Sequence, residues 1–514
     1  MPVAAREPEV FLSDNATKAK TSASLAAGKI RKIGPRLYTR NLRDPIERIV
    51  SRHVWDIVAM YCPGALITGR TALENRPAED GSVFVISDRT ADVEVPGLRI
   101  RSGVGPLATD RTFMGNLYLA SPGRAVLENL VPSRARGGVS RSVSRRAVEA
   151  HLEQVLARSG AAKLNEIRDQ ARDAAPRLGL EDQFKQLDGI IGALLGTRLA
   201  ESITDPSARA RVAGLPYDPR RLEAFEALRA ELASRAPVVR LFGEPGNDAP
   251  DNVAFFEAYF SNFIEGTEFE VDEAYDIVFN NVIPEERPRD AHDVLGTFRV
   301  VADASEMMRL PGDAAELEAL LKSRHATIMS SRPDKGPGRF KRLGNQAGGH
   351  IFVAPDLVRG TLARGMDFYL SLDDPFARAA FIMYLVSEVH PFEDGNGRVA
   401  RVMMNADLVA QGQHRIIIPA VFRNEYLDGL RALSQNGNTR PFASILDFAH
   451  RYTSAIPWAR YGAARQVLQE TNAFLRPREA EANDLRLRLP TAEILLRAEA
   501  DGDGAGGGMS GGPK

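Results

Sequence analysis

The chain has 514 residues, of which 44% are apolar and 26% are charged, so it is long enough for roughly two to four globular domains and is not a single small module. Its 66 basic and 67 acidic residues leave a net charge of −1, which excludes a global attraction to nucleic acid or anionic membranes. Cys62 is the only cysteine, and no stretch approaches the roughly 20 apolar residues that span a bilayer, so we expect a cytoplasmic protein with no internal disulfide, no cysteine-based zinc cluster and no membrane partner.

Residues 1–140 are predicted to form an α+β region. Between Lys18 and Arg43 the chain has eight basic residues and no acidic one. This segment favours a short helix through SASLAAGKIRKIG, then a turn and a strand, which is the order of a small winged helix. Apolar residues recur at helical spacing over Ile46–Tyr61, and VFVISD and GLRIRSG are typical of strands.

The remaining chain is predicted to be mainly α-helical. After a linker rich in Gly, Ser and Arg, residues 141–235 have amphipathic patterns typical of a helical connector. Residues 236–458 are predicted to form a second, mostly helical domain with one extended piece at Gly349–Val353. Residues 459–514 should form a C-terminal helix and a disordered tail, DGDGAGGGMSGGPK, which has too few apolar residues to offset its ordering entropy.

Twelve residues, His390–Arg401 (HPFEDGNGRVAR), lie between two predicted helices. Asp374 and Pro375 are a suitable N-cap and first residue for the helix that ends at His390. The next helix, RVARVMMNADLVAQG, should stop near Gly412. The pattern therefore predicts a tight loop between two helix ends.

This loop has the composition of an anion site. Gly395, Asn396 and Gly397 allow backbone N–H groups to point into one concavity, at the positive end of the next helix dipole, which suits a phosphate. Arg398 and Arg401 lie three residues apart on that helix and offer two guanidinium groups to further phosphate oxygens. A triphosphate therefore fits better than a monophosphate.

Three further residues complete the loop. Asp394 places a carboxylate beside the expected phosphates, where Mg²⁺ is typically held by one or two carboxylates and phosphate oxygens. His390 is the natural base for an attacking hydroxyl, and Phe392 should point into the core to fix the loop. Each feature alone has an ordinary explanation, such as a turn or a solvated helix face, but their combination in one short segment favours a functional site.

The segment resembles the signature HPFx[D/E]GNGRxxR of the Fic (filamentation induced by cAMP) family, and the match is complete. The resemblance implies a mainly α-helical fold with a β-hairpin flap, and transfer of AMP from ATP, with Mg²⁺, to a Tyr, Thr or Ser hydroxyl of a target protein. By position it implies that His390 is the base, that Asp394 binds the metal, and that the phosphates are held by Gly395, Asn396, Gly397, Arg398 and Arg401.

Two further segments are assigned to the site. Residues 337–357 (PGRFKRLGNQAGGHIFVAPDL) are similar to the family's flap, which covers the site and docks the target, with Gly348, Gly349 and His350 at its centre. Asn424 and Tyr426, in the predicted helix RNEYLDGL, are candidates for a nucleobase pocket. A tyrosine in a helix is more often a core or surface residue.

Ser261, Glu265 and Gly266 form the pattern S-x-x-x-E-G at the end of a predicted helix near 255–266. Alone, the pattern suits a surface glutamate before a C-capping glycine. Beside a Fic motif it is similar to the family's inhibitory helix, whose Glu pairs with the second motif Arg and blocks the γ-phosphate. It implies that Glu265 pairs with Arg401 and that the protein is autoinhibited. In some family members the same Glu supports removal of AMP, which is the alternative role for Glu265.

The first 140 residues are loosely similar to antitoxin-type transcriptional regulators of the AbiEi kind, through SLAAGKIRKIGPRLYTRNL, PGALITGRTALE and ASPGRAVLENL. This similarity implies a winged helix whose basic segment contacts DNA phosphates, and a solvated basic face is an equal alternative. Two interpretations follow: an autoinhibited protein adenylyltransferase that modifies a target or itself, or a DNA-binding regulator of toxin–antitoxin type whose Fic module uses another donor or acts as a sensor. The intact His390 and Asp394 favour the enzyme, and a homodimer is compatible with either interpretation.

Overall fold

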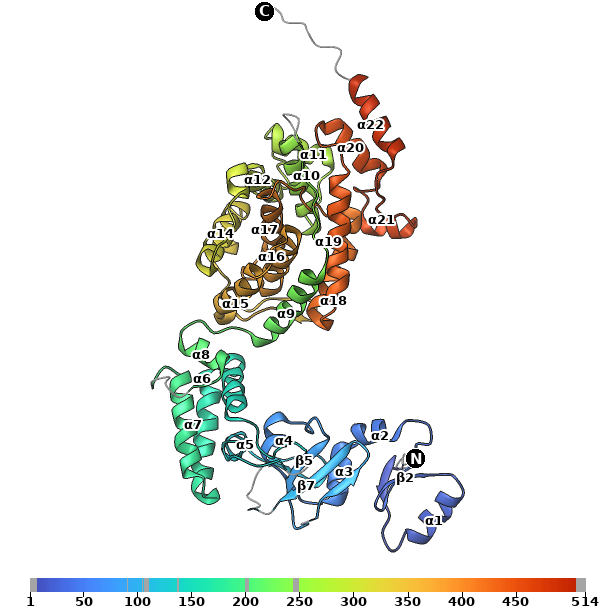
Figure 1. Cartoon of the computed structure of the whole chain (residues 1–514), viewed down its shortest axis with the longest axis vertical. Helices are drawn as coiled ribbons and strands as arrows, with labels where there is room; N and C mark the ends of the chain where they lie inside the picture. The colour runs from blue at the N-terminus through green and yellow to red at the C-terminus, as the bar shows by residue number, and fades with distance from the viewer. Residues whose placement is uncertain are drawn as a thin grey trace, which may run out of the picture. The chain divides into compact units, whose positions relative to one another are not determined.

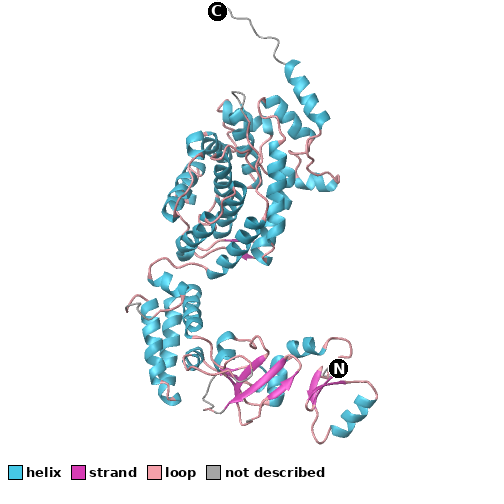
Figure 2. Ribbon diagram, in the orientation of Figure 1, coloured by secondary structure: helices cyan, strands magenta, loops and turns pink. Residues whose placement is uncertain are grey.

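The computed structural model describes residues 7–89, 91–103, 105, 111–135, 138–198, 203–243 and 249–504. The fold is mainly helical with small sheets in the N-terminal region, as predicted (Figures 1 and 2). It divides into two compact units, Met1–Gly214 and Leu215–Lys514. The division falls inside the segment predicted as a connector, so helix α9 (Pro219–Ser234) belongs to the C-terminal unit.

The N-terminal unit begins with a three-stranded antiparallel sheet in the order β1-β3-β2. Its strands are Val10–Leu12 (β1), Arg31–Gly34 (β2) and Leu37–Thr39 (β3), and Lys18–Ala26 (α1) lies between the first two. The expected helix through SASLAAGKIRKIG is therefore too long. It ends at Ala26 because Gly28 has a left-handed φ of 67° and the residues after it pair with β3 instead.

The basic segment Lys18–Arg43 is partly used inside this unit. Arg31 donates to two backbone carbonyl groups, and Arg36 donates to a third. Arg40 forms an ion pair with Glu7 at 2.9 Å. These three guanidinium groups are therefore engaged within the protein, and DNA binding by the segment stays a prediction.

A six-stranded mixed sheet in the order β6-β7-β5-β4-β9-β8 follows. VFVISD and GLRIRSG contribute the parallel pair β5 and β7, and all residues of β5 are buried. Apolar residues of the sheet and of helices α2 and α3 form one core. The elements of this part are α2 Ile46–Arg52, α3 Val54–Tyr61, β4 Leu66–Ile67, α4 Gly69–Glu74, β5 Ser82–Ile86, β6 Val93–Val95, β7 Leu98–Gly103, β8 Arg111–Thr112, β9 Tyr118–Leu119 and α5 Pro122–Asn129.

Three helices complete the N-terminal unit. They are Arg145–Leu178 (α6), Glu181–Leu194 (α7) and Pro206–Val212 (α8), and they share an apolar cluster with α5. The side chain of Ser144 accepts a hydrogen bond from the Ala147 N–H and caps α6. Helices α6 to α8 thus lie in the stretch for which a helical pattern was predicted.

The C-terminal unit is helical, and Figure 1 shows α16 and α17 surrounded by the other helices. Most residues of these two helices are buried, and they pack against each other. The helices after α9 are α10 Ala249–Ile264, α11 Val271–Phe279, α12 Pro288–Ala302, α13 Ala304–Met307, α14 Ala314–Ile328, α15 Val358–Leu370, α16 Pro375–Val389, α17 Asn396–Val409, α18 Arg423–Asn436, α19 Thr439–Ser454, α20 Tyr461–Glu470, α21 Pro477–Ala482 and α22 Ala492–Gly504.

Local signals set the ends of the central helices. The Asp374 side chain accepts a hydrogen bond from the Ala377 N–H at 2.9 Å, and Pro375 is the first residue of α16. The flap is a short antiparallel hairpin of Gln346–Ala347 (β10) and His350–Ile351 (β11). The predicted Gly-rich tail begins within α22, and its residues 505–514 lie outside the described residues.

Within the described residues, every helix is too short or too polar to cross a lipid bilayer.

Candidate active site

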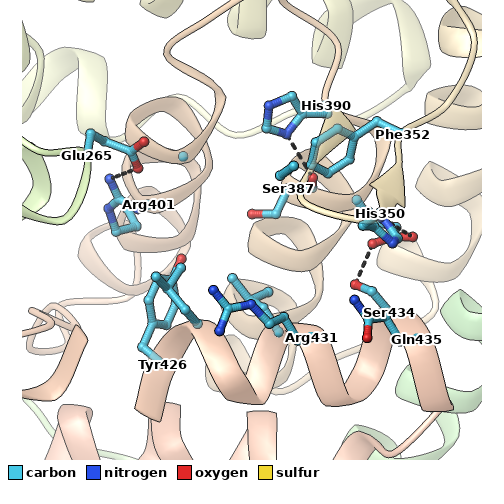
Figure 3. Close-up of a pocket in the computed structure, with 15 residues that line it drawn as sticks. Glu265, His350, Phe352, Ser387, His390, Arg401, Tyr426, Arg431, Ser434 and Gln435 are labelled. Atoms are coloured by element: carbon cyan, nitrogen blue, oxygen red, sulfur yellow. Dashed lines mark hydrogen bonds and ion pairs between the residues drawn. The ribbon is translucent and has the colours of Figure 1, made fainter. Parts of the chain in front are cut away.

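A cavity of about 320 Å³ lies beside the loop that joins α16 to α17 (Figure 3). The flap and α18 form further parts of its wall. Of the residues predicted for the site, the cavity is lined by Glu265, His350, His390, Gly397, Arg401 and Tyr426. The fold thus brings residues that lie far apart in the sequence, from Glu265 to Tyr426, onto one cavity.

His390 caps the C-terminus of α16 in a left-handed conformation with φ of 52°. Its Nδ1 lies 3.2 Å from the carbonyl oxygen of Ser387, which can only accept, so Nδ1 carries the proton and Nε2 keeps a lone pair. The ring of Phe352 stacks on it with a centroid distance of 3.8 Å. Burial lowers the pKa of His390 to about 4, so the ring is neutral and can accept a proton at neutral pH.

The motif loop is closed by its own side chains. Gly395 has φ of 73°, and a Cβ there would lie 2.7 Å from the sulfur of Met329. The Asn396 side chain accepts from the Phe392 N–H at 2.8 Å and donates to the Phe392 carbonyl oxygen at 3.0 Å. Both polar groups of this side chain therefore hold the loop, and the N-terminus of α17 opens beside it as a site of positive potential.

His325, on α14, forms hydrogen bonds that stabilise the motif loop. Its Nδ1 accepts a hydrogen bond from the Gly338 N–H at 2.9 Å, and its Nε2 donates to the Asp394 carbonyl oxygen at 3.0 Å. Phe392 is fully buried and stacks on the His325 ring at 3.7 Å. Burial lowers the pKa of His325 to about 4. The sequence analysis missed His325, because a single histidine in an amphipathic helix carries no distinctive pattern.

The guanidinium group of Arg401 is bound by the end of α10. Its Nη2 lies 2.7 Å from Glu265 Oε1 and 2.8 Å from the Ser261 carbonyl oxygen, and its Nε donates to Ser261 Oγ at 2.9 Å. Desolvation works to raise the pKa of Glu265, but Arg401 outweighs it and holds the pKa below its usual range. Glu265 is therefore ionised in the cavity at neutral pH.

Two glycines shape the surroundings of this ion pair, one through its backbone conformation and one through its lack of a side chain. Gly266, with φ of 89°, ends α10, and the next N–H bonds back to the Asn262 carbonyl oxygen at 3.1 Å. A Cβ at Gly397 would collide with the carboxylate of Glu265. The Glu265 side chain remains 28% exposed, facing the cavity.

Arg398 forms an ion pair with a different acid. Its Nη1 lies 3.0 Å from Oδ2 of Asp293, a fully buried residue on α12 that also pairs with Arg332 at 2.7 Å. Arg398 Nε is buried and has no hydrogen-bond partner in the part of the chain that the structure describes. A donor without a partner next to the motif loop suits an incoming anion.

Asp394 accepts a hydrogen bond from the Gly395 N–H at 2.7 Å. No cluster of three or more His, Cys, Asp or Glu side chains that could hold a metal ion occurs among the described residues. A single carboxylate fits Mg²⁺ that takes its other ligands from nucleotide phosphates and water. Asp394 is the residue that would contribute the carboxylate oxygen.

The flap is attached to the motif loop at its base. The Lys341 N–H donates to the Pro391 carbonyl oxygen at 2.9 Å, and Asn345 Nδ2 donates to the Phe392 carbonyl oxygen at 2.9 Å. Burial, together with the nearby charge of Arg221, lowers the pKa of Lys341 to about 7. Gly348 and Gly349, at the turn, have nothing within 4 Å of an added Cβ, so the turn faces open space.

The two residues suggested for a nucleobase pocket separate in the structure. Tyr426 is 1% exposed, lines the cavity and has a pKa raised by burial. Asn424 donates to Glu481 Oε1 at 2.9 Å and lines a different groove. Other residues of α18 that line the cavity are Leu427, Leu430, Arg431, Ser434 and Gln435.

Comparison with known proteins points to one family. Residues 316–408 match the model of the Fic/DOC family. The chain is 26% identical over 291 residues to the protein adenylyltransferase Fic of Drosophila willistoni, covering 55% of this chain and 56% of that protein. It is 27% identical over 213 residues to the protein of the same name from Nematostella vectensis, covering 40% of this chain and 49% of that protein. The chain thus spans about half the length of these curated relatives.

Solved structures were also matched. A fragment of Fic-1 from Caenorhabditis elegans is 21% identical and covers 60% of this chain and 86% of that chain, with a TM-score of 0.34. A Fic domain containing signaling protein from Bacteroides thetaiotaomicron is 19% identical and covers 45% of this chain and 91% of that chain, also with a TM-score of 0.34. The sequence match is the stronger finding: the chain contains, at residues 316–408, a segment that matches the Fic/DOC family.

Proposed function

We propose that the C-terminal unit is a protein adenylyltransferase, which transfers AMP from ATP to a Tyr, Thr or Ser hydroxyl of a target protein or of this chain itself. The observation that carries the proposal is the geometry at His390: its Nδ1 donates to the Ser387 carbonyl oxygen, and its Nε2 has no partner among the described residues. The ring lines the same cavity as Arg401 and the N-terminus of α17 at Gly397. The names of the curated relatives, which match about half of this chain, support the same activity.

The reaction uses these groups as follows. The target hydroxyl gives its proton to Nε2 of His390 while its oxygen attacks the α-phosphorus of ATP. The bond from the α-phosphorus to the bridging oxygen breaks, and pyrophosphate leaves. The N-terminus of α17 and the guanidinium groups of Arg398 and Arg401 stabilise the phosphate charge. Mg²⁺, contacting Asp394 and the phosphates, would neutralise further charge.

We further propose that Glu265 inhibits this reaction. Arg401 is already bound to Glu265 and Ser261, so it cannot bind a γ-phosphate in the same position. The ionised carboxylate of Glu265 also repels a phosphate that enters the cavity. Release of Glu265 would therefore open the site to a productive triphosphate.

To test both proposals, the wild type, Glu265→Gly and Glu265→Gly/His390→Ala are each incubated with ATP and Mg²⁺. Intact mass spectrometry then measures AMP added to the protein. We expect modification in Glu265→Gly alone, because only this variant has a free Arg401 and a base. Modification that persists without His390 would exclude it as the base. Equal modification of the wild type and Glu265→Gly would exclude the inhibitory role, and the absence of AMP from all three would count against transfer to this chain itself.

A further inference from the structure

Arg221, on α9, connects the flap to the helix that carries His390. One arm of its guanidinium group, Nη1, forms an ion pair with Glu388 Oε1, and the other arm, Nη2, donates to the carbonyl oxygen of Ile351 in β11. Helix α9 lies outside the segment 316–408 that matches the family. The contact is therefore a feature of this chain that the family match does not describe.

Glu388 is the centre of this cluster. It is 2% exposed, two residues before His390, and its Oε2 accepts from Ser434 Oγ at 2.6 Å. His350 Nε2 lies 3.4 Å from Oε1 (Figure 3). Burial works to raise the pKa of Glu388, but its partners outweigh burial and keep the pKa below its usual range. A buried carboxylate with these partners holds α9, the flap and α18 together.

The contacts around Glu388 affect His390 through Phe352, the flap residue that follows Ile351. Phe352 follows Ile351, packs edge-on against His350 at 5.0 Å, and stacks on His390 with an interplanar angle of 9°. A shift of β11 would move Phe352 and uncover His390. The same shift would move the strand edge that the target segment is expected to meet.

We propose that Arg221 and Glu388 are positioning residues that latch the flap over His390. The proposal rests on the adenylyltransferase function, because a fixed flap matters for bringing a target hydroxyl to the base. The two contacts of Arg221 require the planar fork of a guanidinium group. A lysine could pair with Glu388 but could not also reach the Ile351 carbonyl in the same geometry.

The first experiment does not depend on activity. It measures amide hydrogen exchange of the full chain for the wild type, Arg221→Lys and the control Arg220→Lys, whose side chain is exposed on the same helix. We expect flap amides 345–353 to exchange about tenfold faster in Arg221→Lys, with α16 and α17 unchanged and the control equal to the wild type. Unchanged flap exchange in both Arg221→Lys and Arg221→Ala would overturn the latch.

The second experiment separates the latch from the proposed function. In the Glu265→Gly background, Arg221→Lys and Glu388→Gln should lower the rate of AMP incorporation by about tenfold while the KM for ATP changes by less than about twofold. Incorporation equal to that of Glu265→Gly would overturn the positioning role. If Glu265→Gly itself incorporates no AMP, transfer to this chain itself fails, and the exchange measurement still decides the latch.

Discussion

Burial lowers the pKa of both His390 and His325, yet the two residues make different hydrogen bonds. Both ring nitrogens of His325 are hydrogen-bonded to backbone groups, so this residue can only support the loop. In His390 the Ser387 carbonyl oxygen accepts from Nδ1, and Nε2 has no hydrogen-bond partner among the residues that the structure describes. The difference between a structural and a reactive histidine is thus one ring nitrogen.

The lowered pKa of His390 predicts the pH at which the reaction rate falls on the acidic side of the pH–rate profile. A group whose pKa falls from 6.5 to about 4 stays in its basic form down to lower pH. In the Glu265→Gly background with saturating ATP and Mg²⁺, the rate of AMP incorporation should stay flat from about pH 8 to about pH 6 and fall only as pH approaches about 4. A fall centred near the ordinary histidine value would contradict the assignment of His390 as a buried base.

Replacement of His325 tests the support beneath the loop. His325→Ala removes two buried hydrogen bonds and the stacking on Phe392, so we expect the free energy of unfolding to fall by about 2–4 kcal/mol. His292→Ala, on the exposed face of α12, is the matched control and should change it by less than about 0.5 kcal/mol. Urea unfolding followed by circular dichroism measures both, and equal values for the two variants would refute the role.

At the scale of elements, local sequence signals predicted α16 through its Asp374 N-cap, β5 through its continuous apolar run, and β7 through its alternation of apolar and polar residues. The error at residues 31–34 has a tertiary cause, since their strand forms only by pairing with β3. The motif residues could be found because they are contiguous. Arg221, His325 and Phe352 could not, because they reach the site from separate elements and have no local pattern.

The flap should also control the proton affinity of the base. Phe352→Ala removes the ring that covers His390, so water reaches the imidazole and its pKa should rise toward 6.5. In the Glu265→Gly background, the acid limb of AMP incorporation should therefore move up to near that value. Phe340→Ala, which removes a flap ring that contacts Phe392 instead, should leave the limb in place. If the rate of both variants falls at the same acidic pH as that of Glu265→Gly, the flap does not set the pKa of His390.

At the scale of the whole molecule, four histidines of the C-terminal unit have a pKa that burial lowers strongly. Burial is the largest cause that lowers the pKa of His325, His390, His414 and His450 from 6.5 to about 4 each. Each ring is neutral in the folded chain and binds a proton more readily when unfolded. Their contribution to stability is complete above pH 6.5 and is lost as pH falls toward about 4.

Asp407 opposes this trend. Burial raises its pKa from 3.8 to about 6, so the folded chain gains a proton, and stability, as pH falls below about 6. The stability gained at Asp407 is smaller than the stability lost at four histidines. We therefore expect the melting temperature of the full chain to fall between pH 6.5 and pH 4.5. The melting temperature of His414→Phe should fall less steeply with pH, because one of these histidines is removed. Differential scanning calorimetry across this range is the measurement. A constant melting temperature would mean that the histidines are solvated.

His390 also stands in a backbone conformation that most side chains avoid, with φ of 52°. A substitution there changes two properties at once: it removes the base, and it alters the local cost of the turn by roughly 1 kcal/mol. Asparagine tolerates this region of φ better than alanine does. His390→Asn is therefore the cleaner inert form for trapping a bound target, because it removes the base and keeps the turn into the motif.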